Sequence, residues 1–395
     1  MRKHDLGALI ASSPANVFYT SDLCPFGRCF ALLPRDRNVE PALIVPISAP
    51  TPVVLMSPPW ISDVRYYGEF YVMTRWAKEP LTDAERKLVR AQEAWEKTKQ
   101  TDPTLILIKL LKERGITKGR IGVDESNLPP ESPPWKEIKT NLPSLEPVAA
   151  QQIFREIRMV KSAEEIKRIQ EALRITEKAW QTALEQTREG ITEEEFSDAY
   201  QHTIISEGGS IVSMMGMYGP PIGFGPRTAF PDIAFPSDYR LKKGDLIRLD
   251  GGCSYMGYPC DMGRSAVLGE PSERLRKYYD ALLAGEQLAI EMAKVGVKAS
   301  DIFNAVASMV RKRGLEHYVR HHTGHGWGIE GYDPPLIGPR DDTALEEGMT
   351  FCFETPYYEV GWGGPMIEDV VVITKSEARF LTKFDRKLYV IGKWS

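Results

Sequence analysis

The strongest constraint on the fold of this chain is that two segments each place a pair of acidic residues on either side of a turn. In the first, Asp250 and Asp261 flank a turn centred on residues 254–257. A regular hairpin about this turn sets the two aspartates directly opposite each other, with Cβ atoms about 4.5–5.5 Å apart, unless a bulge shifts the register. In the second, Glu354 and Glu368 flank a glycine-containing loop, and a symmetric hairpin about Gly361 again sets the carboxylates opposite each other.

Two opposed pairs of acidic residues require neutralisation. Like charges that face each other on a sheet destabilise it unless a cation lies between them. Carboxylates together with the single imidazole of His325 suit divalent Mn, Zn, Co or Fe, and bridging carboxylates hold two such ions about 3.5–4 Å apart, where they generate a nucleophilic hydroxide. The alternative is that the acids solvate an outer strand face, but the apolar neighbours of both pairs favour a metal site.

The rest of the sequence predicts two domains. Helical patterns open with the capping boxes at Ser162 and Thr192, and strand-like runs surround both acidic pairs, which together favour an α+β class. A proline-dense stretch over residues 129–147 is expected to contain no regular helix. We therefore place a domain boundary on its far side and predict domains over residues 1–152 and 153–395.

Composition narrows the class of protein. The 50 Lys and Arg residues nearly balance the 54 Asp and Glu residues, which argues against a nucleic-acid or anionic-membrane partner. No apolar run approaches the length of a membrane span, and five cysteines do not form a disulfide framework in a chain of 395 residues. We expect a cytoplasmic protein without nucleic-acid or membrane partners.

Several motifs resemble those of the creatinase/aminopeptidase family, also called the pita-bread or M24 peptidase family, and within it the Xaa-Pro dipeptidases and aminopeptidases. The resemblance lies in LDGGCSYMGYPCDMGRS, TGHGWG, FETP and IED around the acidic pairs and His325, and in LGALIASSPANVFYTSDL near the N-terminus. It implies a pita-bread catalytic domain preceded by a creatinase-like N-terminal α/β domain, and a homodimer.

The resemblance also implies a ligand set and catalytic roles. Two divalent ions, Mn, Co, Zn or Fe, would be held by Asp250, Asp261, His325, Glu354 and Glu368. The second aspartate and the last glutamate would bridge the ions, and Glu354 would act as general base or proton shuttle. The family's second histidine is absent, so we expect Tyr332 or His322 to steady the oxyanion that develops at the substrate carbonyl.

Three positions depart from the family pattern. Asp232, Tyr332 and Met366 stand where family peptidases carry His, His and Arg. Asp232 would bind a substrate amine and Tyr332 would donate a hydrogen bond to the substrate, unless both are ordinary loop residues. Trp60 lies in a proline-containing loop that in related dimers caps the partner's site, so it is a further candidate for substrate contact, with ordinary packing as the alternative.

The favoured function is metal-dependent hydrolysis of an amide bond in a small substrate, with an Xaa-Pro dipeptide as the first expectation. One alternative keeps the metal site but acts on an osmolyte-type molecule, as ectoine hydrolase or dimethylsulfoniopropionate lyase do. A second is a non-catalytic binding protein, against which the complete ligand set argues. Cys352 shares a strand face with Glu354, and a Cys–His nucleophile with His325 is a weaker use of that imidazole than metal binding.

Overall fold

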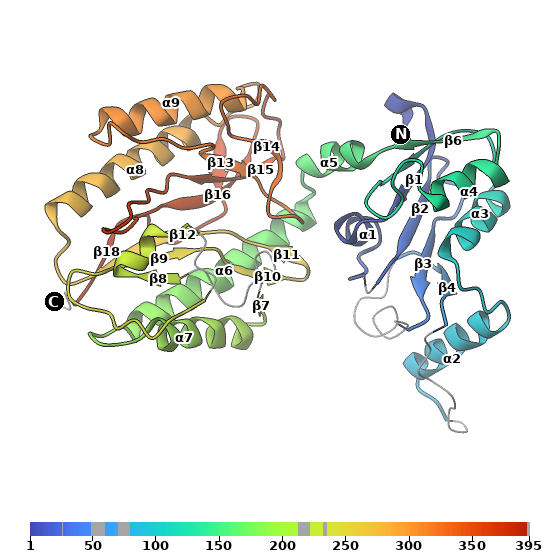
Figure 1. Cartoon of the computed structure of the whole chain (residues 1–395), viewed down its shortest axis with the longest axis horizontal. Coiled ribbons are helices and arrows are strands. Elements are labelled where there is room, and N and C mark those ends of the chain that lie inside the picture. The colour runs from blue at the N-terminus through green and yellow to red at the C-terminus, as the bar shows by residue number, and fades with distance from the viewer. Residues whose placement is uncertain (26, 49–59, 70–79, 212–221, 232–234, 393–395) are drawn as a thin grey trace. The chain divides into compact units, whose positions relative to one another are not determined.

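The computed structural model describes residues 1–25, 27–48, 60–69, 80–211, 222–231 and 235–392 (Figure 1). The chain divides into two compact units, Met1–Arg155 and Glu156–Ser395. The helix α5 (Gln151–Met159) spans this division, which lies close to the boundary expected after residue 152. Within the described segments, no helix is both long enough and apolar enough to cross a membrane.

The first unit is built on a six-stranded sheet in the order β4-β3-β2-β1-β5-β6. Its strands are β1 (Leu6–Ala11), β2 (Phe30–Pro34), β3 (Ala42–Pro46), β4 (Asp63–Tyr67), β5 (Gly119–Val123) and β6 (Leu145–Ala149). The sheet is mixed, because β2 runs antiparallel to both of its neighbours while the pairs β3–β4, β1–β5 and β5–β6 are parallel. The unit's helices are η1 (Arg2–His4), α1 (Pro14–Ser21), α2 (Asp83–Glu96), α3 (Pro103–Glu113) and α4 (Pro133–Asn141).

The expectation that the proline-dense stretch contains no helix is wrong. Helix α4 begins at Pro133, and Pro134 follows it within the first turn. A proline is tolerated there because the first amide groups of a helix have no intrahelical acceptor and the ring already holds a helical φ. Pro147 lies in β6, the edge strand of the sheet, where a missing N–H breaks no ladder.

The second unit contains two pairs of packed helices. Its helices are α6 (Ala163–Glu185), α7 (Glu193–Ser206), α8 (Glu273–Met292), α9 (Ala299–Lys312) and the short η4 (Gly225–Ala229). The predicted capping boxes are present: Ser162 and Thr192 each accept from the third residue of the helix, and the Glu side chain there accepts from the cap backbone. Figure 1 shows α6 beside α7 and α8 beside α9, with the strands of the unit running between the two pairs.

The main sheet of the second unit has the order β14-β13-β15-β16-β12-β9-β8, with β17 added to β16 and β18 to β12. Its strands are β8 (Ile222–Phe224), β9 (Leu246–Asp250), β12 (Gly263–Leu268), β13 (Gly324–Gly326), β14 (Asp333–Leu336), β15 (Thr350–Glu354), β16 (Glu368–Ile373), β17 (Ala378–Phe380) and β18 (Tyr389–Ile391). A smaller sheet joins β7 (Ser210–Ile211), β10 (Cys253–Tyr255) and β11 (Tyr258–Pro259). Helices and mostly antiparallel strands in one unit confirm the predicted α+β class.

The core of the second unit lies between α8, α9 and the central strands. Phe351 and Phe353 on β15 and Val371 on β16 are fully buried in one cluster with residues of both helices. The side chains that alternate with these on β15 and β16 point to the opposite face of the sheet. That face carries Cys352, Glu354 and Glu368, and it is the face on which the candidate site lies.

Candidate metal centre

The second hairpin has the predicted register. Strands β15 and β16 are antiparallel, and Glu354 pairs directly with Glu368. Glu354 is 7% exposed and Glu368 is 1% exposed, so both carboxyl groups are withdrawn from water. Two acids paired in this way repel each other unless one is protonated or a cation lies between them.

The first hairpin has a different register from the one predicted. Asp250 pairs with Gly263 rather than with Asp261, and the turn between β10 and β11 is Met256–Gly257, where both residues have positive φ. Two consecutive positive φ values are typical of the type I′ turn that suits a two-residue hairpin. Because the true turn lies one residue further along the chain than the expected one, Asp250 faces Gly263, and Asp261 lies diagonal to Asp250 across the hairpin, still on the same face.

One cross-strand row contains three of the acids and a glycine. Asp250 on β9, Gly263 on β12, Glu368 on β16 and Glu354 on β15 are paired in succession. A Cβ atom on residue 263 would lie 2.8 Å from the Cβ of Glu368 and 2.7 Å from the Cε of Met366, which is closer than real Cβ contacts. Gly263 is therefore required, because only a residue without a side chain leaves room for Glu368 and Met366.

The ligand atoms of four buried residues gather over this row. One ligand atom from each of Asp261, His325, Cys352 and Glu368 lies within 4.8 Å of the other three. His325 reaches the group because it lies on β13, directly opposite Cys352 on β15. Asp261 comes from the segment between β11 and β12 and is 4% exposed.

The electrostatics of the group favour a bound cation. Burial, and after it the charges of neighbouring acids, raise the pKa of Asp261 and of Glu368 well above the usual carboxyl range. Burial likewise raises the pKa of Glu354 to about 7, despite the opposing effect of Arg320. Asp261 Oδ1 and Glu368 Oε2 are buried and have no hydrogen-bond partner among the described residues. These residues fit divalent metal ions, which would satisfy both oxygens and neutralise the acids.

His325 is a buried and neutral imidazole, as a metal ligand must be. Burial lowers the pKa of its imidazole to about 4. Its Nδ1 lies 3.3 Å from the Gly326 carbonyl oxygen, and a hydrogen on Nδ1 donated to that oxygen leaves Nε2 free to bind a metal. Tyr332 stacks on the imidazole with ring centroids 3.9 Å apart, although the residue is 60% exposed. Partial burial and the nearby carboxylates raise the pKa of Tyr332, so its hydroxyl stays a hydrogen-bond donor.

His322 and Arg320 both contact Glu354. His322 Nδ1 lies 3.1 Å from Glu354 Oε1, and burial lowers the pKa of His322 to about 2, so the imidazole is neutral. Arg320 Nη2 lies 3.4 Å from Glu354 Oε2, and Arg320 Nε is buried with no partner within the described chain. Glu354 thus has a neutral imidazole beside one oxygen and a permanent cation beside the other.

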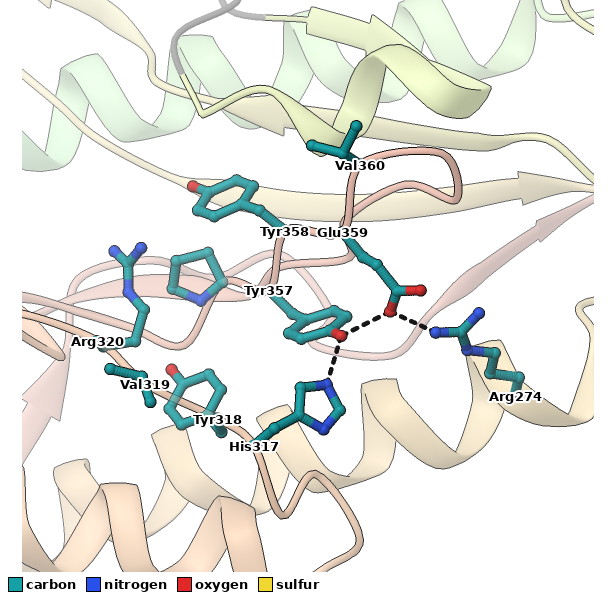
Figure 2. Close-up of a pocket in the computed structure, with 10 residues that line it drawn as sticks. Arg274, His317, Tyr318, Val319, Arg320, Tyr357, Tyr358, Glu359 and Val360 are labelled. Atoms are coloured by element: carbon teal, nitrogen blue, oxygen red, sulfur yellow. Dashed lines mark hydrogen bonds and ion pairs between the residues drawn. The ribbon is translucent and has the colours of Figure 1, made fainter.

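A pocket of about 590 Å³ opens beside Arg320 (Figure 2). Pro356, two residues after Glu354, is part of its wall, together with Val319 and Tyr358. The ring of Tyr358 lies under the Arg320 guanidinium at 5.5 Å. Figure 2 shows Arg320 and Tyr358 on one side of the pocket, and on the other a hydrogen-bonded chain that joins His317, Tyr357, Glu359 and Arg274. The volume is in the range of small-ligand sites.

A buried ion cluster fixes the loop that carries Tyr332. Asp333 is buried, and its two oxygens accept from Arg158 Nη2 at 2.8 Å and Lys161 Nζ at 3.4 Å. A carboxylate with two cations in a water-excluded site holds its backbone in one place. Tyr332, the preceding residue, is thereby kept over His325.

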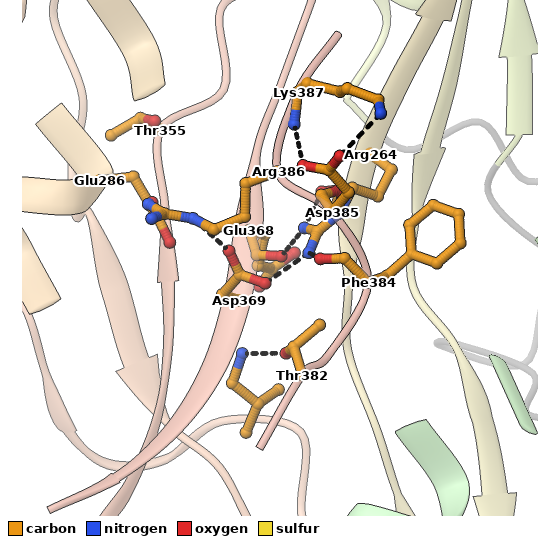
Figure 3. Close-up of polar contacts among 12 residues, drawn as sticks. Arg264, Glu286, Thr355, Glu368, Asp369, Thr382, Phe384, Asp385, Arg386 and Lys387 are labelled. Atoms are coloured by element: carbon orange, nitrogen blue, oxygen red, sulfur yellow. Dashed lines mark hydrogen bonds and ion pairs between the residues drawn. The ribbon is translucent and has the colours of Figure 1, made fainter. Parts of the chain in front are cut away.

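A second buried network holds β16 from the other side of the sheet (Figure 3). Arg264 is fully buried; its Nη1 donates to the Glu368 carbonyl oxygen at 2.6 Å and its Nη2 pairs with Asp369 at 2.5 Å. Arg386 joins Asp369 to Glu286 on α8. Because Glu368 and Asp369 are consecutive, this network fixes the strand at the residue that carries the Glu368 carboxylate.

Asp232 and Trp60 are the remaining predicted substrate residues, and Met366 is the third departure from the family pattern. Asp232 lies outside the described residues. Trp60 belongs to the first unit, where it is 64% exposed and its indole N–H donates to the Thr20 carbonyl oxygen at 2.9 Å. Met366 is fully buried on the face of the sheet that carries the candidate site, and its thioether packs against Gly263.

Sequence reasoning missed the role of Arg320 and of the ion cluster at Asp333. Arg320 reaches Glu354, and Arg158 reaches Asp333, only because distant segments fold together. A local signal did exist for Arg320, since it precedes His321 and His322 directly ahead of the His325 motif. A cation five residues before a predicted ligand is the signal that could have identified it.

The chain is similar in sequence to a metallopeptidase family and to an individual dipeptidase. Residues 167–375 match the model of metallopeptidase family M24. The chain is 32% identical over 297 residues to an Xaa-Pro dipeptidase of Pyrococcus horikoshii, and the match covers 74% of this chain and 79% of that protein.

Solved structures share the fold over almost the whole chain. The prolidase from Pyrococcus horikoshii superposes with a TM-score of 0.73 at 26% identity, covering 98% of this chain and 97% of the other. The X-Pro aminopeptidase from Thermotoga maritima superposes with a TM-score of 0.78 at 23% identity, covering 98% of each chain. These structures confirm the predicted fold, in which a creatinase-like domain is followed along the chain by a pita-bread domain.

Proposed function

Because the chain belongs to metallopeptidase family M24, we propose that it is a dinuclear metal-dependent hydrolase that cleaves the amide bond of Xaa-Pro dipeptides. That it is an enzyme, a metal-dependent hydrolase, follows from the family. The observation that carries the finer proposal is the buried group of donors in which Asp261 Oδ1 and Glu368 Oε2 have no partner among the described residues.

The ions would be held by the predicted ligands Asp250, Asp261, His325, Glu354 and Glu368. Divalent ions at such a site polarise the substrate carbonyl and lower the pKa of a water molecule, so that it attacks at neutral pH. Manganese, cobalt, zinc and iron all accept a donor set of carboxylates with one imidazole. The network of Arg264 and Asp369 keeps the Glu368 backbone in position before any ion arrives.

Glu354 and His322 are the groups that handle protons. With Nδ1 and Oε1 only 3.1 Å apart, a protonated Glu354 can donate to the neutral imidazole, whose Nδ1 also accepts from the Gly324 N–H. Glu354 can therefore accept a proton as the carbonyl is attacked and return it to the leaving nitrogen. Tyr332, protonated and stacked on His325, supplies a hydroxyl donor for the developing oxyanion.

Arg320 is the proposed anchor for the substrate carboxylate. Its guanidinium lies at the junction between Glu354 and the pocket, and its Nε is buried without a partner in the described chain. A guanidinium binds a carboxylate through two parallel hydrogen bonds, which fixes both distance and orientation. Because Met366 replaces the arginine that family peptidases carry, the cation would reach the substrate from the pocket side instead.

The test is a proline-release assay with the fully metal-loaded enzyme and a panel of Xaa-Pro dipeptides. Small cyclic and betaine-like compounds are assayed in parallel. We expect release of proline from at least one dipeptide, and at least a hundredfold less with Glu354→Gln at equal metal content. Turnover of a cyclic or betaine-like compound with no turnover of any dipeptide would replace the peptidase proposal by the osmolyte alternative. No turnover of any compound by protein that binds no metal would favour a binding protein.

We further propose that the enzyme is a cytoplasmic homodimer. The family resemblance supports this proposal, as does the large exposed indole of Trp60, which is an apolar surface of the kind that interfaces cover. Light scattering should give twice the mass of one chain, and Trp60→Ala should weaken the association. A monomeric mass at micromolar concentration would contradict the proposal.

A further inference from the structure

Cys352 is a fully buried thiol on the strand face that carries Glu354. It alternates with Glu354 along β15, and its cross-strand partners are His325 on β13 and Val370 on β16. Directly paired residues of an antiparallel sheet project to the same side. The register therefore places the thiol beside the imidazole that the proposed metal centre uses.

The sulfur lies at the distance of a ligand. The Sγ atom of Cys352 and ligand atoms of Asp261, His325 and Glu368 are all within 4.8 Å of one another. Donors bound to one ion at roughly 2.0–2.3 Å are no more than about 4.6 Å apart, so these four atoms occupy little more space than one coordination sphere. Two of the oxygens in this space, Asp261 Oδ1 and Glu368 Oε2, are buried without partners in the described residues.

The neighbouring cysteines of the first hairpin have other contacts. The Cys253 thiol donates to the Ala172 carbonyl oxygen at 3.2 Å, and the Cys260 sulfur lies 3.1 Å from Thr176 Oγ1. Neither belongs to the group of donors formed by the described residues. Cys253 is therefore a suitable control, being equally buried but turned toward a helix instead of the donors.

We propose that Cys352 is a sulfur ligand of the ion held by Asp261, His325 and Glu368. On binding, the S–H bond breaks, its proton passes to solvent and a metal–sulfur bond forms. A thiolate is a soft donor, so it shifts the preference of an otherwise oxygen-rich site from manganese toward zinc, cobalt and cadmium. The inference rests on the proposed metal centre, and it adds a residue and a metal preference to that centre.

The test is a titration of metal-free protein with Co²⁺, followed by absorption spectroscopy. A cobalt–thiolate bond gives an intense charge-transfer band in the near ultraviolet, which oxygen and nitrogen ligands do not give. We expect the band in the wild-type protein and in Cys253→Ser, and its loss in Cys352→Ser. We also expect Cys352→Ser to weaken Cd²⁺ binding at least tenfold while Mn²⁺ binding changes less than threefold.

The outcomes separate this inference from the proposed function. Binding of Co²⁺ by the wild-type protein without the band, or a band that persists in Cys352→Ser, would overturn the sulfur ligand and leave the hydrolase proposal intact. Failure to bind Co²⁺ at all would overturn both. Because a wild-type spectrum without the band overturns the sulfur ligand by itself, the inference can be refuted whether or not the serine variant folds.

Discussion

Glu354 and Glu368 form a directly paired couple of acids on adjacent central strands, and both are buried. This pair destabilises the folded protein when no metal is bound, because two carboxylates in a water-excluded site cannot both be ionised without a counter-charge. The strands are held in this arrangement by apolar packing on one face and by the Arg264 network at Asp369. The cost is removed when cations bind, which is what ties the fold of this sheet to metal chemistry.

The metal-free protein should lose stability as the pH rises. The pKa of Glu354 is raised by burial to about 7, against about 4.5 in an unfolded chain, so folding takes up a proton between these pH values. The contribution of Glu354 to the free energy of unfolding is therefore largest below about pH 4.5. About 3 kcal/mol of it is lost as the pH rises from there through 7. Urea unfolding of the metal-free protein at a series of pH values should show this slope, and Glu354→Gln should reduce it, leaving the part that comes from the raised pKa values of Asp261 and Glu368. A metal-free stability that rises over the same window in both proteins would contradict the argument.

Gly263→Ala should damage the site by crowding it. The added Cβ would lie within 2.8 Å of Glu368 Cβ and Met366 Cε, so one of the two strands must shift. Overpacking of a core costs about 1–3 kcal/mol, and a displaced Glu368 would weaken metal binding as well. Thermal unfolding and metal titration measure the two effects. The double variant Gly263→Ala, Met366→Ala removes one of the contacts and should recover part of the loss; no recovery would show that the thioether is not the obstacle.

Arg320→Ala should reduce the hydrolysis of substrates that carry a free carboxylate. A hydrogen bond between charged groups contributes about 1.5–3 kcal/mol, which corresponds to a loss of roughly 10- to 100-fold in kcat/KM. The same dipeptide with its carboxylate converted to an amide should lose less than threefold. Arg274→Ala is the matched control, because Arg274 lines the same pocket but pairs with Glu359. Equal losses on acid and amide would mean that Arg320 acts only through Glu354.

Asp333→Ala should be among the most destabilising substitutions near the site. It would leave Lys161 without its counter-ion in a buried location, at a cost of about 3–5 kcal/mol, while Arg158 would keep its ion pair with Glu330. Tyr332 would lose its fixed place over His325. Chemical denaturation gives the stability change. A displaced Tyr332 should lower kcat, which is measured at saturating substrate. A change below about 1 kcal/mol would show that the cluster does not anchor this loop.

Local sequence patterns predicted some elements well and others poorly. The Glu354 hairpin was predictable because its symmetric loop and the two acids define one register. The Asp250 hairpin was not, because Met256 adopts a positive φ that methionine rarely takes, so the two-residue turn gave no signal. The helix at Pro133 was missed because proline was treated as a breaker instead of a first-turn residue. Contacts such as Arg320 with Glu354 depend on chain segments that meet only in the folded protein, and no local pattern encodes them.

The central claim, that the buried donors bind two divalent ions for hydrolysis, is tested most directly by metal stoichiometry. Inductively coupled plasma mass spectrometry of the dialysed, metal-loaded protein should give two equivalents of divalent metal per chain. Asp261→Asn, which removes a charge from a proposed bridging ligand, is the variant to compare and should retain less than half of that amount. A wild-type protein that holds no metal after loading would contradict the account.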